Sequence, residues 1–319
     1  MTLPRLAVNL ALLIGVALAV ALFIAARVNA RAQAFEAEFP PHGELLMVKG
    51  KRVQAYVMGD GPDIVLIHGA SGNALDMLNA LGADLAKTNR VIAFDRPGLG
   101  YSDALDDQSL AAQVDILAAA GKQLDLRNPL IVGQSYGGAV SLAWALHGPI
   151  KPRGLVLISA ASMPWPAPLD ITYRIADTRI GAALALPTAA ALLPRSYIET
   201  AVASVFAPEA VPDNYATAIA APLSIRLTTL RANMAQVNAL RDQLVAMLPS
   251  YPALTLPIEM LHGTADTIVP AQVHSIPFAK LVASAHLQLL EGAGHMPHYT
   301  RKTDVLAAIA RAEARAALR

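Results

Sequence analysis

The chain has 319 residues, of which 55% are hydrophobic and 15% charged, and its formal net charge is +1. This composition excludes a disordered chain and is more apolar than that of an ordinary soluble domain. The sequence has no long basic or acidic run, so we expect no nucleic-acid partner. The absence of cysteine excludes disulfides and thiolate metal sites, and it leaves the cellular compartment open.

Much of the excess apolarity lies near the N-terminus. Residues 6–26 carry no charge, and Asn9 is their single polar side chain. A helix of that length is about 31 Å long, which matches a hydrocarbon core of about 30 Å. We therefore expect residues 1–41 to form a single-pass membrane anchor with its span at about 6–26, followed by a polar connector that is helical or irregular. The flanking basic residues are too evenly divided to orient the span.

A cleaved signal peptide is the alternative interpretation of the same segment. Ala30-Arg31-Ala32 and Ala32-Gln33-Ala34 resemble small-x-small cleavage sites, and cleavage there would leave a secreted or periplasmic protein. The apolar region of a signal peptide is usually about 7–15 residues long. The longer apolar stretch in this chain favours a retained anchor.

After the connector, strand-like and helix-like segments alternate. Strands are predicted at residues 44–48, 52–58, 63–67, 91–94, 130–133, 155–159, 258–261 and 287–290, the first two as an antiparallel hairpin. Helices are predicted at residues 75–87, 111–124, 136–146 and 271–282 and from about 304 onward. This alternation predicts an α/β fold with a mostly parallel sheet flanked by helices, in which ligands gather beyond the carboxyl ends of the strands.

Residues 163–252 interrupt the alternation and are called the helical insert below. They are rich in alanine and leucine and punctuated by prolines, which predicts several short helices. We expect the insert to form a cap over the strand ends. The core of the fold is then expected at residues 42–162 and 253–319.

The segment Gly133-Gln134-Ser135-Tyr136-Gly137 matches the pattern G-x-S-x-G. An apolar strand precedes it and a helix follows it, which is the context that presents a serine hydroxyl above a sheet on a strained turn. A glycine-serine turn without catalytic role is the plainer alternative. The strand–turn–helix context favours Ser135 as a nucleophile.

A serine hydroxyl needs a base, and the base needs a carboxylate to hold it. His295 follows the last strand in a glycine-rich loop, and Asp266 follows the strand at 258–261, giving the chain order Ser, Asp, His. The alternative for Asp266 is a turn or helix-capping residue. His298 lacks the Gly-x-Gly lead-in of His295, so we interpret it as a packing or loop-supporting residue.

The segment His68-Gly69-Ala70-Ser71-Gly72 follows the third strand. Its functional interpretation is an oxyanion hole, in which the backbone N–H groups of Ala70 and Tyr136 stabilise a tetrahedral oxyanion. Ser71 could add its hydroxyl, and a plain glycine-rich turn is the alternative. We interpret His68 as a structural hydrogen-bonding residue.

The segment that ends the next strand carries Asp95 and Arg96, which we interpret as a structural pair that braces the site. The sequence lacks G-x-G-x-x-G, H-E-x-x-H and P-loop patterns. It also shows no convincing carboxylate–histidine cluster. We therefore expect neither a metal nor a cofactor.

Five segments, HGASG, DRPGLGYSD, GQSYGG, HGTADTIVP and GAGHMPH, together resemble the sequential landmarks of the α/β-hydrolase superfamily. The resemblance runs from about residue 44 to the C-terminus. It implies a triad of Ser135, Asp266 and His295, with Ala70 and Tyr136 as oxyanion donors. Serine at the nucleophile position points away from the epoxide hydrolase and haloalkane dehalogenase branches, which are known for aspartate there.

Gln134 stands where many relatives carry histidine, and we expect it to be dispensable for the chemistry. Three functions remain open: hydrolysis of an ester, C–C bond hydrolysis or cofactor-free peracid and haloperoxide chemistry on the same triad, and non-catalytic binding. The anchor and the apolar insert favour a small, apolar ester as substrate. Ser71, Met163, Trp165 and Tyr173 are candidate substrate contacts, although the last three could equally form the interior of the cap.

Overall fold

The computed structural model describes residues 3–166 and 168–318 of the chain. In this part of the chain an eight-stranded sheet runs in the order β1-β2-β4-β3-β5-β6-β7-β8. The strands are β1 (Glu44–Val48), β2 (Lys51–Met58), β3 (Asp63–Ile67), β4 (Arg90–Phe94), β5 (Leu130–Gln134), β6 (Gly154–Ile158), β7 (Ile258–Gly263) and β8 (Ala285–Leu290). β2 pairs antiparallel with β1 and β4, whereas every pair from β4 to β8 is parallel. The mostly parallel sheet predicted from the sequence is confirmed.

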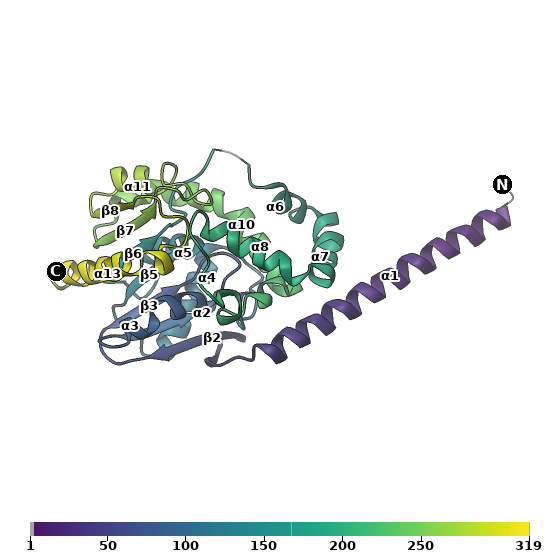
Figure 1. Cartoon of the computed structure of the whole chain (residues 1–319), viewed down its shortest axis with the longest axis horizontal. Coiled ribbons are helices and arrows are strands. Elements are labelled where there is room, and N and C mark those ends of the chain that lie inside the picture. The colour runs from purple at the N-terminus through teal and green to yellow at the C-terminus, as the bar shows by residue number, and fades with distance from the viewer. Residues whose placement is uncertain (1–2, 167, 319) are drawn as a thin grey trace.

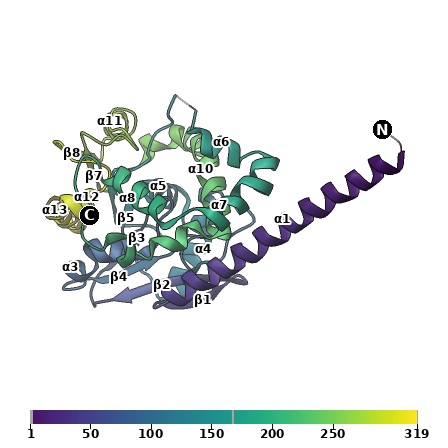
Figure 2. The same cartoon turned by 45° about the vertical axis from the view of Figure 1, so that its right-hand side comes forward.

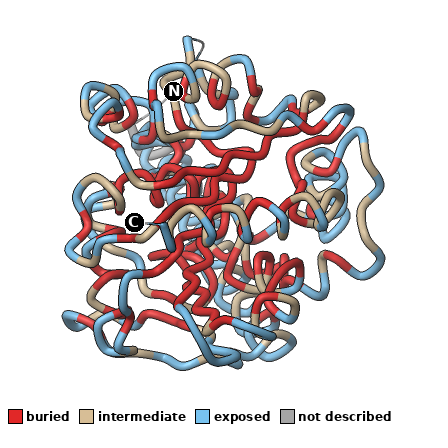
Figure 3. The backbone as a smooth tube through the Cα atoms, turned by 90° about the vertical axis from the view of Figure 1, so that its left-hand side faces the viewer, coloured by how far each residue is buried: buried red, intermediate tan, exposed pale blue. Residues whose placement is uncertain are grey.

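The central strands are continuous apolar runs because both faces of the sheet are covered. Every residue of β3, β5 and β6 is buried, and Figure 3 shows this buried centre in red. Successive side chains of a strand point to opposite faces. Accordingly, Val65 and Ile67 pack in one apolar layer, and Ile64 and Leu66 pack in the other.

Helices cover the two faces of the sheet (Figure 1). The layer with Val65 contains α4 (Leu110–Gln123), α5 (Tyr136–His147) and α11 (Ser275–Leu281). The layer with Ile64 contains the helical run α2 (Ala74–Met77), η1 (Leu78–Gly82) and α3 (Ala83–Leu85), together with α13 (Lys302–Ala317). A short helix, α12 (Pro297–Thr300), precedes α13 and has no counterpart among the predicted elements.

The helical insert contains α6 (Ile171–Ala176), η2 (Gly181–Ala185), α7 (Leu186–Leu192), α8 (Arg195–Phe206), α9 (Tyr215–Ala218), η3 (Ala221–Ile225), α10 (Leu227–Met247) and η4 (Leu248–Ala253). Most of these are short, as the prolines predict, and Pro187, Pro222 and Pro249 each lie in the first turn of an element. The exception is α10, which has 21 residues and contains no proline.

The insert packs on loops that follow the carboxyl ends of strands. Asn233 of α10 accepts a hydrogen bond at 2.7 Å from the backbone N–H of Ser71, which follows β3. Glu209 accepts one at 3.0 Å from the backbone N–H of Gly294, which follows β8. The insert therefore holds the loops that carry the candidate oxyanion donor and the candidate base.

The N-terminal segment is one continuous helix, α1 (Leu3–Glu38), which projects from the body of the protein (Figures 1 and 2). Its large apolar side chains from Val8 to Phe23 are more than half exposed. The connector expected after the span is therefore fully helical up to Glu38. This helix is long and apolar enough to be a membrane anchor or a signal sequence.

The second half of α1 lies on the helical insert. Phe35 is buried in an apolar cluster with Ile198 and Phe206 of the insert. The Arg31 guanidinium donates hydrogen bonds to the carbonyl oxygens of Ala191 (3.2 Å) and Leu193 (2.6 Å) at the end of α7. These carbonyls would otherwise lack partners within their own helix. The N-terminal helix and the insert thus share one interface.

Candidate active site

Ser135 lies at the turn between β5 and α5, with φ 53° and ψ −118°. This backbone conformation is strained for a non-glycine residue. The turn is possible because its flanking glycines lack side chains: a Cβ on Gly137 would lie 2.2 Å from the carbonyl oxygen of Ile67, and one on Gly133 would lie 2.3 Å from Ser141 Oγ. The predicted strand–serine–helix context is therefore present in the fold.

Asp266 and His295 come together from two loops. His295 Nδ1 lies 2.7 Å from Asp266 Oδ2, and both side chains are almost fully buried. The other carboxylate oxygen accepts hydrogen bonds from the backbone N–H groups of Ile268 and Val269, each at 2.9 Å. These donors fix the carboxylate so that it faces the histidine ring.

A second histidine, His262 of β7, also contacts this carboxylate. Its Nε2 lies 3.2 Å from Asp266 Oδ2 and 2.5 Å from the carbonyl oxygen of Val269. Because both neighbours are acceptors, His262 carries its proton on Nε2. Burial alone would raise the pKa of Asp266, but the hydrogen bonds from His262 and His295 outweigh it and lower that pKa below its usual range. The carboxylate is therefore ionised at neutral pH.

The reactive nitrogen of His295 faces Gln134. The two atoms, Gln134 Nε2 and His295 Nε2, lie 3.3 Å apart. Since the amide nitrogen is a donor, His295 Nε2 is an acceptor and the ring proton sits on Nδ1, facing Asp266. This is the tautomer that a general base requires. Across the described residues, Ser135 Oγ makes no hydrogen bond to this nitrogen.

From its sequence position we expect Gln134 to be dispensable, yet its amide lies against the candidate base. Its side chain also lies over the loop of residues 68–72, called the oxyanion loop below after its proposed role, because a Cβ on Gly69 would lie 2.3 Å from Gln134 Oε1. The same hypothetical atom would lie 3.1 Å from Ser135 Cβ, so the loop after β3 adjoins the serine. Pattern matching missed Gln134 because its neighbours come from distant parts of the chain.

The two proposed oxyanion donors are available. In the described part of the chain, the backbone N–H groups of Ala70 and Tyr136 donate no hydrogen bond. Tyr136 is the first residue of α5, where backbone N–H groups have no partner within the helix, so its N–H is free to bind a ligand atom. Both N–H groups can donate hydrogen bonds to a developing negative charge.

The direction of the Ala70 N–H is fixed by its own peptide group. The carbonyl oxygen of Gly69 accepts hydrogen bonds from Arg96 Nη2 (2.9 Å) and His68 Nδ1 (2.8 Å). In a trans peptide the N–H points opposite to the C=O. Anchoring the Gly69 oxygen on Arg96 and His68 therefore turns the N–H of Ala70 away from them. Arg96 and His68 act as positioning residues for this donor.

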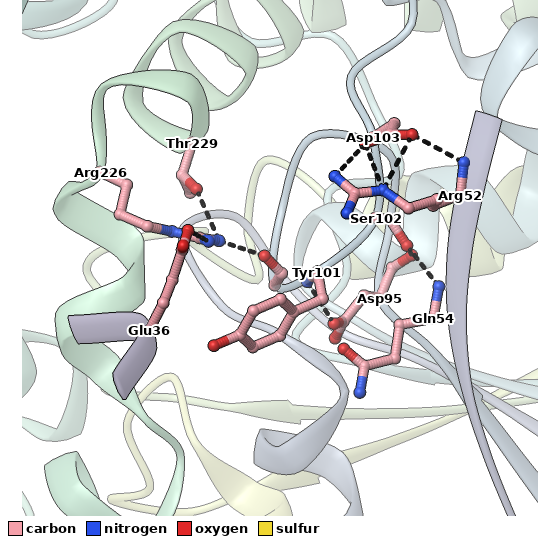
Figure 4. Close-up of polar contacts among 10 residues, drawn as sticks. Glu36, Arg52, Gln54, Asp95, Tyr101, Ser102, Asp103, Arg226 and Thr229 are labelled. Carbon is pink, nitrogen blue, oxygen red and sulfur yellow. Dashed lines mark hydrogen bonds and ion pairs between the residues drawn. The ribbon is translucent and has the colours of Figure 1, made fainter. Parts of the chain in front are cut away.

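Asp95 and Arg96 do not form the pair that we inferred from the sequence. Arg96 extends under the oxyanion loop, where its guanidinium lies 4.2 Å from the centre of the Tyr136 ring. The Asp95 carboxylate instead accepts backbone hydrogen bonds from Ala74 and Tyr101, both at 2.8 Å. Figure 4 shows Asp95 beside Tyr101. Adjacent residues at a strand end point in opposite directions, which explains the separation.

His298 is placed as expected, away from the base. It is fully buried, and its Nε2 lies 3.2 Å from Asp76 Oδ2. The hydroxyl of Tyr215 donates to the other carboxylate oxygen at 2.8 Å, so this cluster joins the core to the insert.

The candidate substrate contacts lie near the site without a demonstrated role. Ser71 is exposed beside the insert. The backbone N–H of Met163 donates to His274 Nδ1 at 3.2 Å, and the Trp165 ring lies 6.1 Å from the His274 ring. His274 is buried near Asp266 and His295, and its pKa is lowered to about 4, mainly by burial. Met163 and Trp165 thus border the acid side of the site.

Among the described residues, no group of three or more histidine, aspartate or glutamate side chains is arranged to hold a metal ion.

A mostly parallel sheet with a serine elbow after β5 and histidine and aspartate loops after β8 and β7 is the architecture of the α/β hydrolases. The model of the Alpha/beta hydrolase family matches residues 64–309. The match covers most of the chain, and the chain therefore belongs to the α/β hydrolase family.

Similar proteins include several hydrolases. An uncharacterized protein of Mycobacterium tuberculosis is 29% identical over 268 residues, covering 82% of this chain and 77% of its own length. A 2-hydroxymuconate semialdehyde hydrolase from Pseudomonas sp. is 27% identical over 266 residues, covering 80% and 88%. Among solved structures, an esterase from Exiguobacterium antarcticum matches with a TM-score of 0.68 and 21% identity, covering 85% of this chain and 100% of its own.

The environment of His68 generates a prediction about pH. Burial and the neighbouring Arg96 lower the pKa of His68 from 6.5 to about 3. Below pH 6.5 this histidine binds a proton in the unfolded chain but stays neutral in the folded protein. The contribution of His68 to the free energy of unfolding is therefore complete above pH 6.5 and is lost as the pH falls. Between pH 7 and pH 5 the loss from this group is about 2 kcal/mol.

We expect His68→Gln, which cannot be protonated, to lower the free energy of unfolding at pH 7 and to make it less dependent on pH. Urea unfolding at pH 7 and pH 5 measures both effects. The exposed His147→Gln is the control and should retain the pH dependence of the unchanged protein. An unaltered pH dependence in His68→Gln would contradict the assignment.

Proposed function

We propose that the protein is a membrane-anchored serine hydrolase that cleaves an apolar ester through an acyl-enzyme. The observation that carries the proposal is the buried pair of Asp266 and His295, 2.7 Å apart, beside the strained turn of Ser135. The two vacant backbone donors of Ala70 and Tyr136 supply the remaining component that acyl transfer needs.

In this mechanism the residues act in a fixed order. His295 Nε2 takes the proton from Ser135 Oγ as the oxygen attacks the ester carbonyl. Asp266 stabilises the imidazolium, and Ala70 and Tyr136 bind the oxyanion. His295 then gives the proton to the leaving alcohol, and a water molecule activated by the same ring releases the acid.

Before the attack, His295 must exchange its contact with the Gln134 amide for one with the serine hydroxyl. Catalytic hydrogen bonds are often loose without substrate and tighten when it binds. Without substrate, the Gln134 amide donates to His295 Nε2 and so keeps this nitrogen unprotonated. This contact supports a positioning role for Gln134.

Hydrolysis of a C–C bond is the second candidate. The relative from Pseudomonas sp. named 2-hydroxymuconate semialdehyde hydrolase, at 27% identity over most of both chains, favours it. The same serine, base and oxyanion donors serve both reactions. Product analysis with an ester and with a vinylogous diketone distinguishes them.

The anchored state is supported by the way α1 joins the body. Both candidate cleavage sites, Ala30-Arg31-Ala32 and Ala32-Gln33-Ala34, lie inside the helix that packs on the insert. Cleavage there would remove Arg31, whose guanidinium binds the carbonyl oxygens at the end of α7. Retention keeps this contact and places the catalytic body directly at a bilayer, where apolar esters dissolve.

The nucleophile is tested by Ser135→Ala. Removing the attacking oxygen should lower kcat for a panel of p-nitrophenyl esters by a factor on the order of 10⁴ or more, and abolish labelling by a fluorophosphonate probe. Ser196→Ala, at an exposed serine of α8, is the matched control and should change neither readout. Equal turnover by Ser135→Ala, or failure of the folded unchanged protein to react with the probe, would contradict the proposal; the second result favours a binding protein.

The acid is tested by Asp266→Asn. The amide would present a donor to His295 or hold the ring in the wrong tautomer, so we expect kcat to fall by about 10⁴-fold. The fluorophosphonate probe should still label Ser135, but slowly. Asp106→Asn, at an exposed position, controls for the loss of a negative charge. Retention of near-normal kcat would show that Asp266 is a turn residue.

The anchor is tested by placing arginine at both Leu13 and Val16. Each arginine in the middle of a span costs about 2.5–3.5 kcal/mol on insertion scales, so the protein should leave the fraction that resists an alkaline carbonate wash. Gln33→Arg, outside the span, should stay in it. An N-terminus beginning at Gln33 or Phe35 in the unchanged protein would show instead that the segment is a cleaved signal.

A further inference from the structure

The helical insert carries a contiguous apolar surface that faces away from the core. Its members are the exposed side chains of Ile175 on α6, Ile180 directly before η2, Leu184 on η2 and Leu192 on α7. Ile180 is 74% exposed and Leu184 65% exposed, more than any other large apolar residue outside α1 in the described chain except Leu318 near its end. These side chains line one open groove, and we call them the insert apolar surface. Such clusters mark interaction sites.

The insert apolar surface lies beside the apolar part of α1. Helix α7 packs directly on α1, and Figures 1 and 2 agree that α6 and α7 are on the side of the body from which the N-terminal half of α1 projects. On α1, the half-buried or buried positions Ile24, Val28, Arg31 and Phe35 form one helical face. The first of these, Ile24, belongs to the apolar span at 6–26. The contact between the body and α1 therefore extends into the C-terminal end of the apolar span.

Ion pairs hold the insert in place on α1. Arg226 at the start of α10 forms an ion pair with Glu36 at 2.7 Å and also bonds Gly100 of the core (Figure 4). Arg195 at the start of α8 pairs with Glu38. Since α1 is helical without interruption to Glu38, its inserted and docked halves form one rigid element. Anchoring the first half fixes the height of the insert.

Charged residues border the α6 end of the insert apolar surface. Arg174, Asp177 and Arg179 are all exposed, next to Ile175 and Ile180. Apolar side chains bordered by charged ones are typical of helices that lie in the interface of a membrane. Both signs of charge are present, so this rim does not select anionic over neutral lipids.

We propose that the insert apolar surface rests in the headgroup and upper acyl region of the bilayer that holds α1. The inference rests on the proposed membrane anchor. The bilayer is the occupant that the geometry favours because the surface lies beside the span and α1 is docked on the same insert. The insert also holds the loops of the active site, so a substrate dissolved among acyl chains would meet the protein at this surface.

The test uses the absence of cysteine in the chain. Single cysteines replace Ile180, Leu184, Val16 and Leu289 in the full-length protein, and each is labelled with an environment-sensitive fluorophore in phosphatidylcholine vesicles. Lipids with nitroxides at the headgroup, upper chain or lower chain then report the depth of each probe. Leu289, 45% exposed on the edge strand β8, is the control for an apolar residue elsewhere on the body. Reaction of Ser135 with the fluorophosphonate probe verifies that each variant is folded.

We expect deep nitroxides to quench the probe at Val16. Probes at Ile180 and Leu184 should shift to the blue and be quenched by upper-chain nitroxides, as for elements about 5–10 Å deep in the interface, whereas Leu289 should stay unquenched. If Val16 is quenched and the insert probes behave like Leu289, the anchor stands and this inference is overturned. If Val16 is unquenched, the anchor and the inference fail together. Crosslinking between copies through Ile180→Cys without quenching would show that a second copy covers the surface.

Discussion

The guanidinium of Arg96 is the constraint on which the site depends. It is fully buried and has no carboxylate partner among the described residues, so burial lowers its pKa to about 10 and it remains a cation. Its donors reach the carbonyl oxygens of His68 and Gly69 in the oxyanion loop and the side chains of Gln113 in α4 and Gln236 in the insert. A buried charge is tolerated only when its hydrogen bonds are satisfied. The Arg96 side chain thus connects the sheet, a covering helix, the insert and the loop that carries Ala70, the proposed oxyanion donor.

Much of the fold follows from local sequence patterns, because each buried parallel strand is a short apolar run and each ends at a polar or glycine-rich loop. Ser135 could be predicted for the same reason: its strained turn, flanking glycines and helix are consecutive in the chain. The partners of Arg96 could not, since they lie 17 to 140 positions away and no local spacing encodes them. The contacts of Gln134 and His262 were missed for the same reason. Both residues sit at predicted strand ends, and only the packing of separate loops determines what they touch.

Three residues that are distant in the sequence hold the candidate base, His295, in position. Asp266 fixes one nitrogen of His295, Gln134 faces the other, and Glu209 of the insert binds the backbone just before the ring. A displacement of the insert would therefore act on the loop of His295 as well as on Ser71, whose N–H bonds Asn233. The insert is mechanically coupled to both halves of the candidate site: the candidate base and the oxyanion loop.

The uninterrupted helix from the apolar span into the insert has a consequence for how the protein meets its substrates. A flexible linker would let the folded body move through a volume set by the length of the linker. Here residues 27–38 are helical and docked, about 18 Å of rigid rod at 1.5 Å per residue, so the body keeps one orientation relative to α1. With the proposed anchor inserted in a bilayer, the search of the body for substrate is confined to two dimensions, along the plane of that bilayer. Any shortened soluble form should accordingly begin no later than Arg27, because Arg31 and Phe35 belong to the folded body.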